Sequence, residues 1–111
     1  MRDTHFDVLI VGSGAAGLSL ALQLPDTLSI GLISKSDLNS GSTSWAQGGM
    51  AAVLHERDTI ESHVADTIQA GAGLCHEDAV TFTVERSRSV VNWLVAQGVD
   101  FDLRNDQPDD E

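Results

Sequence analysis

FDVLIVGSGAAGL, residues 6–18, is the stretch that decides the fold of this chain. Residues 6–11 are almost continuously apolar and rich in β-branched side chains, which is typical of a parallel strand covered on both faces. Gly12, Gly14 and Gly17 then form the pattern G-x-G-x-x-G, placed after a strand and before a helix. The first glycine lets the chain turn, the second lets a diphosphate approach the backbone, and the third lets the helix pack on the strand. The pattern therefore predicts a dinucleotide-binding unit with the diphosphate at the helix start.

Two further segments complete the predicted βαβ unit. Residues 15–24 predict a buried helix that ends at Pro25, and residues 29–34 predict a second strand, parallel to the first through a right-handed crossover. An acidic residue usually ends this second strand and accepts hydrogen bonds from ribose hydroxyls. Here Lys35 follows the strand and the nearest acid is Asp37. The chain therefore departs from the general fingerprint, because a lysine donates hydrogen bonds and cannot accept them.

A loop follows the second strand. Residues 36–44 are rich in Ser, Asn, Gly and Asp, a composition typical of loops. Gly48 and Gly49 interrupt a run of small apolar residues, which indicates close approach of the backbone to a flat or bulky group, or else a plain turn. Trp45 leaves two roles open, stacking on a ligand or filling the core, and packing in the core is favoured.

The second half of the chain is predicted to be mainly helical. Residues 58–61, Asp-Thr-Ile-Glu, resemble a capping box that opens an amphipathic helix ending near Gly71. A longer helix is predicted from about residue 77 or 78 to residue 97, with Gly98 at the C′ position. The alternation of apolar and polar side chains in residues 99–104 predicts a short, half-buried strand.

Length and composition limit the classes of function. The 111 residues carry a formal net charge of −11 with only six scattered basic residues, which argues against a nucleic-acid partner. No apolar run reaches the length of a membrane span, and Cys75 is the only cysteine, so we expect a cytoplasmic protein without an intrachain disulfide. A doubly wound sheet needs more strands than this sequence predicts, so we expect the N-terminal part of a longer protein.

Four blocks of sequence resemble the L-aspartate oxidases, which belong to the succinate dehydrogenase and fumarate reductase flavoprotein superfamily. They are Gly-Ser-Gly-Ala-Ala-Gly-Leu at 12–18, Ile-Ser-Lys at 33–35, the loop GSTSWAQGGMAAV at 41–53, and SHVADT at 62–67 with AGAGLC at 70–75. The resemblance implies an α/β fold: a Rossmann-like FAD-binding βαβ unit in an incomplete doubly wound parallel sheet, with additional helices. Residues 1–55 would form the dinucleotide-binding core and flavin loop, and residues 56–111 a helical extension with a short strand. The family's capping and C-terminal helical domains would lie outside this chain.

The resemblance also implies which residues hold the cofactor, FAD. The backbone of residues 13–16 would hold the diphosphate, Lys35 would lie by the adenosine ribose, and the loop would run along the flavin. Superfamily members with covalently bound flavin carry a histidine in this loop, at the position of Ser42, so the resemblance implies non-covalent FAD here. No residue of this chain is expected to be catalytic, and no metal site is expected. The implied cofactor-binding set is Gly12, Ser13, Gly14, Ala15, Ala16, Gly17, Lys35, Ser42, Thr43, Ser44, Trp45, Ala46, Gln47, Gly48 and Gly49.

The implied activity is that of an FAD-dependent oxidoreductase in de novo NAD biosynthesis. L-aspartate would be oxidised to iminoaspartate, and oxygen or fumarate would reoxidise the flavin. The partners would be these small molecules, with the next enzyme of the quinolinate pathway as a further candidate, and neither nucleic acid nor membrane. Two alternatives stay open: a fumarate reductase or succinate dehydrogenase type of flavoprotein with non-covalent flavin, and a non-catalytic nucleotide-binding fragment. Residues 1–111 alone are expected to be inactive.

Overall fold

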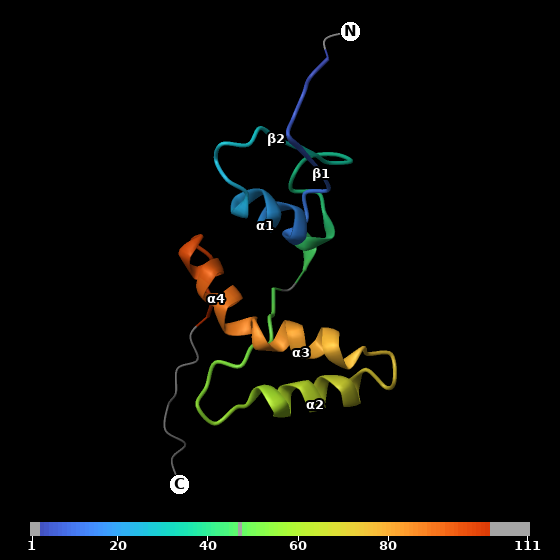
Figure 1. Ribbon diagram of the computed structural model, residues 1–111, viewed down its shortest axis with the longest axis vertical. Coiled ribbons are helices and arrows are strands. Elements are labelled where there is room, and N and C mark those ends of the chain that lie inside the picture. Colours follow the sequence, from blue (N-terminus) through green and yellow to red (C-terminus); the bar gives the residue numbers. More distant parts are fainter. Residues whose placement is uncertain (1–2, 47, 103–111) are drawn as a thin grey trace. The chain divides into compact units, whose positions relative to one another are not determined.

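The computed structural model of this chain describes residues 3–46 and 48–102 (Figure 1). They fall into two compact units, within residues 1–49 and 50–111. The first unit contains strand β1 (Val8–Val11), helix α1 (Ala15–Gln23), strand β2 (Ile30–Ile33) and the short 3-10 helix η1 (Ser42–Trp45). The second contains helices α2 (Ile60–Ala70), α3 (Glu77–Glu85) and α4 (Ser87–Ala96). None of the helices in the described ranges is long and apolar enough to cross a membrane.

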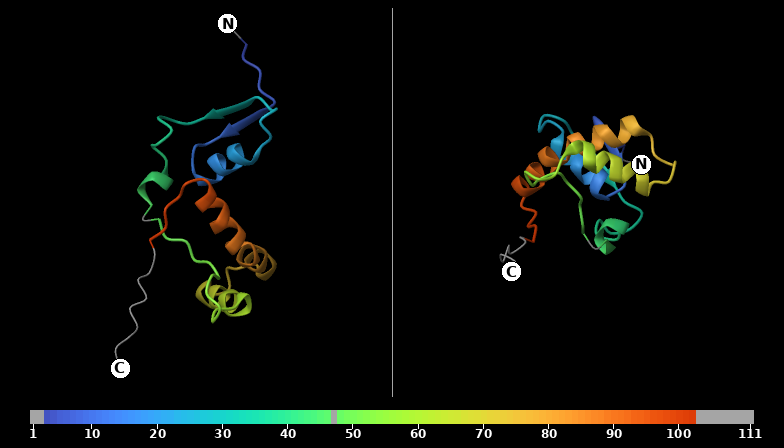
Figure 2. Two further views of the ribbon diagram at one scale, coloured as in Figure 1. Left: turned by 90° about the vertical axis from the view of Figure 1, so that its left-hand side faces the viewer. Right: turned by 90° about the horizontal axis from the view of Figure 1, so that it is seen from below.

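The predicted βαβ unit is present in the first unit. β1 and β2 pair in parallel, with Val8 opposite Ile30 and Val11 opposite Ile33 (Figure 2). β1 begins two residues later than predicted, and the Phe6 ring before it covers Gly31, where an added Cβ would lie 2.6 Å from that ring. The parallel pairing brings the carboxyl ends of both strands to the same edge of the sheet, where dinucleotides bind in this class of fold.

The burial predicted for the first helix is wrong. Every residue of α1 is half-buried or exposed, and Leu22 on this helix keeps 61% of its surface exposed. Ile10, in β1, is the only large apolar side chain that is buried among the described residues of this unit. The physical reason is the small sheet: two short strands offer α1 too little surface to cover its apolar side chains.

In the second unit, α2 and α3 pack side by side (Figure 1). The helix cap of α2 differs from the prediction by one residue. Thr59 occupies the N-cap position, and its side chain accepts a hydrogen bond from the Ser62 amide at 3.1 Å. Asp58 instead accepts a hydrogen bond from the amide of Thr59, at 2.9 Å. A threonine cap serves as well as an aspartate cap, so the helix begins one residue later than the predicted box implies and ends at Ala70, close to the predicted end.

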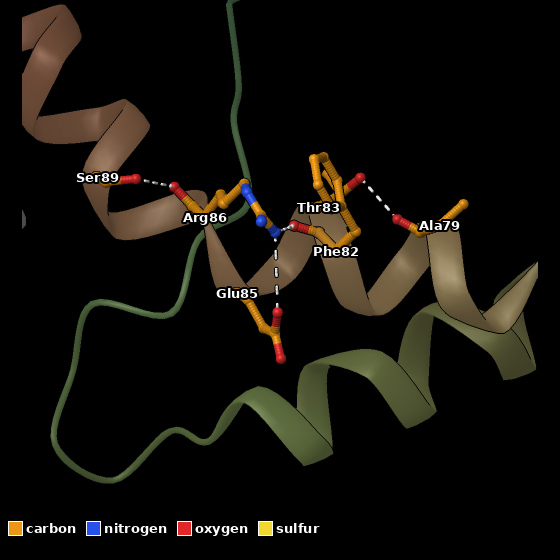
Figure 3. A network of polar contacts seen from close by, with 6 residues as sticks. All are labelled: Ala79, Phe82, Thr83, Glu85, Arg86 and Ser89. Carbon is orange, nitrogen blue, oxygen red and sulfur yellow. Dashed lines mark hydrogen bonds and ion pairs between the residues drawn. The ribbon is translucent and has the colours of Figure 1, made fainter.

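The single long helix predicted for residues 77–97 is wrong, because Arg86 divides it into α3 and α4 (Figure 3). Arg86 sits at φ −93° and ψ −5°, its guanidinium donates to the Phe82 carbonyl at 2.9 Å, and it lies 3.6 Å from the centre of the Phe82 ring. The Ser89 hydroxyl donates to the Arg86 carbonyl at 2.8 Å. Serine side chains can bond to backbone groups in this way and so compete with the hydrogen bonds of a helix. Ser89 does so here at the junction of α3 and α4.

The end of α4 agrees with the prediction, whereas the segment after it does not. Gly98 has a φ of +90° at the C′ position, and its amide donates to the Val95 carbonyl. The Val99 amide donates to the Leu94 carbonyl, which completes a Schellman motif. Residues 99–102 form no strand, and the remaining residues of the predicted strand, Leu103 and Arg104, lie outside the described residues. An alternating pattern needs a neighbouring strand to pair with, and the described part of this unit holds only helices.

Candidate dinucleotide-binding site

The glycine turn after β1 has the conformation that its sequence predicts. Gly12 has a φ of +113°, a region of backbone conformation that side chains disfavour, and its amide donates to the Ile33 carbonyl at 2.8 Å. A Cβ on Gly17 would lie 2.1 Å from the Gly12 carbonyl oxygen and 3.2 Å from the Ile10 side chain. The first glycine therefore makes the turn, and the third lets the start of α1 pack against the end of β1.

The start of α1 presents amide groups to solvent. Its first i to i−4 bond runs from the Leu18 amide to the Gly14 carbonyl, at 3.0 Å, so the amides of Ala16 and Gly17 precede the ladder. Gly14 at the N-cap offers no side-chain cap, and the first turn of the helix carries no acidic residue. Ala15 and Ala16 are exposed. The positive end of the helix dipole is thus open to an anion.

The side chain of Ser13 has a structural role at this turn. It is 7% exposed, its hydroxyl donates to the Leu38 carbonyl at 2.8 Å, and it lies 3.1 Å from the Ser34 hydroxyl. Ser34 follows β2 directly, so this contact joins the two strand ends. Ser13 can therefore offer an anion only its backbone amide.

Thr43 connects the loop to the start of α1. The Ala15 amide donates a hydrogen bond to Thr43 Oγ1 at 3.1 Å, across 28 positions of sequence. A Cβ at Gly14 would lie 3.4 Å from the same oxygen, which is ordinary van der Waals contact, so the approach does not depend on glycine at this position. No sequence signal indicates this bond, since it depends on how the loop returns to the turn.

The other predicted site residues that the structure describes are exposed. Lys35 lies one residue beyond Ser34, at the same edge of the sheet as the turn. The predicted packing of Trp45 in the core is wrong, since 83% of its surface is exposed on η1, a single short turn that holds no buried residue. Gln47 lies outside the described residues. The remaining predicted loop residues are all exposed: Ser42, Ser44, Ala46, Gly48 and Gly49.

These features fit the diphosphate of a dinucleotide. Free amides at the helix start supply hydrogen-bond donors, and Lys35 supplies a positive charge at the same sheet edge. Nothing lies within 4 Å of the Cβ position at Gly48 or Gly49, so the backbone there is open to a flat group.

Comparison with known proteins agrees with this geometry. The model of the FAD binding domain family matches residues 7–110. The L-aspartate oxidase of Pseudomonas aeruginosa is 62% identical over 105 residues, covering 95% of this chain and 19% of that protein. The L-aspartate oxidase of Yersinia pestis is 58% identical over 96 residues, covering 86% of this chain and 18% of that protein.

A solved structure of an E. coli quinol fumarate reductase mutant is similar with a TM-score of 0.86. Its sequence is 35% identical, and the match covers 96% of this chain and 19% of that one. This chain thus spans about a fifth of the length of these curated relatives.

Proposed function

Because this chain belongs to the FAD binding domain family, we propose that it is the FAD-binding part of an L-aspartate oxidase. The observation that carries the proposal is the open start of α1, to which the loop of residues 42–49 is joined through Thr43. Identity of 62% to an L-aspartate oxidase extends over this turn, the loop and the helices after them. We assign residues 1–55 to the dinucleotide-binding core and flavin loop, and residues 56–111 to a helical extension.

Each element of the site has a separate task toward FAD. The amides of Ala16 and Gly17 hold the diphosphate, because they precede the helix ladder and lie at the positive end of the dipole. Lys35 lies toward the adenosine ribose, as a hydrogen-bond donor. Residues 42–49 run along the flavin, where the two glycines admit its ring system. The bound flavin supplies the redox chemistry by accepting a hydride equivalent from the substrate.

The substrate we propose is L-aspartate, which is oxidised to iminoaspartate in the route to NAD, with oxygen or fumarate as the acceptor. The described residues of the site are suited to hold and orient FAD, and we assign to none of them a role in binding the amino acid. We therefore propose that the groups that bind L-aspartate lie outside residues 1–111. The next enzyme of the quinolinate pathway, which consumes this reactive imine, is a candidate partner.

We also propose that the flavin is held without a covalent bond. The hydroxyl of Ser42, exposed on η1, cannot form the histidyl link of the covalent superfamily members. Denaturation of the loaded protein in acid separates the two cases. Flavin released into the supernatant supports the proposal, and flavin that stays with the precipitated protein contradicts it.

A second candidate is a fumarate reductase type of flavoprotein, favoured by the similarity to E. coli quinol fumarate reductase at a TM-score of 0.86. The two candidates differ in the electron donor. The intact protein, purified from its own source with FAD, is mixed anaerobically with L-aspartate or with succinate while the flavin absorption band is followed. Bleaching by L-aspartate alone supports the oxidase. Bleaching by succinate alone supports the second candidate, and failure to bind FAD overturns both.

A further inference from the structure

Two hydroxyl groups join the glycine turn to the loop that follows β2. Ser13 Oγ donates to the Leu38 carbonyl at 2.8 Å, and Thr43 Oγ1 accepts from the Ala15 amide at 3.1 Å. The two contacts lie at neighbouring positions of the turn and at separate positions of the loop. Both contacts are made between groups of the chain itself, so they can hold the loop on the turn.

The two contacts differ in how open they are to water. Ser13 is buried, whereas Ala15 and Thr43 are both exposed. Water can replace an exposed hydrogen bond at small cost, so the Thr43 contact is the one that can open and close. Thr43 also lies within η1, part of the loop proposed to meet the flavin.

We propose that Thr43 is a positioning residue that latches the flavin loop to the first amide of α1 and so sets the loop before FAD arrives. This inference rests on the proposed function, because it concerns the same site. It changes the expected role of Ala15: its amide is engaged by Thr43, which leaves the amides of Ala16 and Gly17 for the diphosphate.

Preorganisation of this kind has a defined kinetic consequence. If only a fraction of the molecules holds the loop in place, the apparent affinity for FAD falls by that fraction. Loss of the latch therefore slows association with FAD. Loss of a direct contact with the cofactor, by contrast, acts mainly on the rate of dissociation.

Two substitutions isolate the acceptor atom. Thr43→Val keeps the shape of the side chain and removes the oxygen, whereas Thr43→Ser keeps the oxygen. Thr27→Val, at an exposed threonine in the turn between α1 and β2, is the matched control. Hydrogen exchange of the Ala15 amide is measured at residue resolution in the intact protein freed of FAD, and the rate of FAD association is measured by stopped flow.

We expect Thr43→Val to speed exchange at Ala15 about fivefold and to slow FAD association by a similar factor, the size of one typical net hydrogen bond. Thr43→Ser and Thr27→Val should leave both rates close to those of the unmodified protein. Unchanged exchange at Ala15 in Thr43→Val overturns the latch, as does a change confined to FAD dissociation. If the unmodified protein binds no FAD, the proposed function fails, while exchange at Ala15 still decides whether the latch exists.

Discussion

Gly17→Ala is the substitution that the geometry of the turn opposes most directly. The added Cβ would lie 2.1 Å from the Gly12 carbonyl oxygen, whereas real Cβ atoms essentially never approach another atom within 3.0 Å. The obstacle is a backbone atom of Gly12. The Gly12 amide donates to the Ile33 carbonyl at 2.8 Å, so the Gly12 peptide cannot rotate away without loosening the end of the strand. Overpacking costs about 1–3 kcal/mol, and alanine recovers up to about 1 kcal/mol of helix propensity. Because the overlap is nearly 1 Å, we expect a net loss of about 2 kcal/mol.

The assay is denaturant unfolding followed by circular dichroism, together with FAD binding of the intact protein. Gly41→Ala is the matched control, because Gly41 has an ordinary φ of −74° and nothing lies within 4 Å of its Cβ position. We expect Gly41→Ala to leave the midpoint of unfolding unchanged or slightly raised, since alanine restricts the unfolded chain. Gly17→Ala should lower the midpoint and weaken FAD binding. A Gly17→Ala protein as stable as the unmodified one would refute the steric reasoning.

Three further substitutions test the helical unit, each by the shift in its denaturant midpoint. Thr59→Ala removes the hydroxyl that accepts from the Ser62 amide and should cost about 1 kcal/mol, while Thr59→Ser should cost little. Ser87→Ala removes the hydroxyl that accepts from the buried Val53 amide at 3.3 Å, and it should cost about 1–2 kcal/mol. An unchanged midpoint would show that water replaces the hydroxyl. Gly98→Ala places a Cβ at a φ of +90° and should cost about 1–2 kcal/mol, whereas Gly98→Asn should cost less; equal effects of the two would contradict the conformational argument.

The features that the sequence predicts correctly are those set by local chemistry. The parallel βαβ unit follows from an apolar strand, a glycine turn and a second apolar strand, and the roles of Gly12 and Gly17 follow from backbone geometry. The end of α4 follows from Gly98, which adopts the left-handed conformation expected at C′. Each of these depends on residues that lie close together in the chain.

The features that the sequence does not predict depend on contacts between distant segments. The break at Arg86 accompanies a hydrogen bond from the Val53 amide to Ser87, 34 positions away, which fixes the start of α4. The engagement of the Ala15 amide by Thr43 depends on the path of the loop. Exposure of Trp45 depends on what the fold provides to cover it, which its own residue type does not determine.

The predicted site residues also divide into those set by local sequence and those set by contacts with distant segments. The pattern of glycines locates the turn proposed to hold the diphosphate, and the register of β1 with β2 brings Lys35 to the same edge. The pattern cannot distinguish which amides of the turn stay available, because that depends on the Thr43 hydroxyl, which accepts from the Ala15 amide. Ser13 is buried against the chain after β2, although its place within the glycine pattern indicates only a backbone role.

The hydroxyl contacts around the turn also bear on the order in which the chain assembles. Ser13 and Leu38 are 25 positions apart, and Ala15 and Thr43 are 28 positions apart. Closing loops of such modest length carries a small entropic cost, and folds built from near neighbours in sequence form quickly. The loop partners of the turn, Leu38 and Thr43, both precede the second unit in the sequence. These two contacts can therefore form without helices α2, α3 and α4.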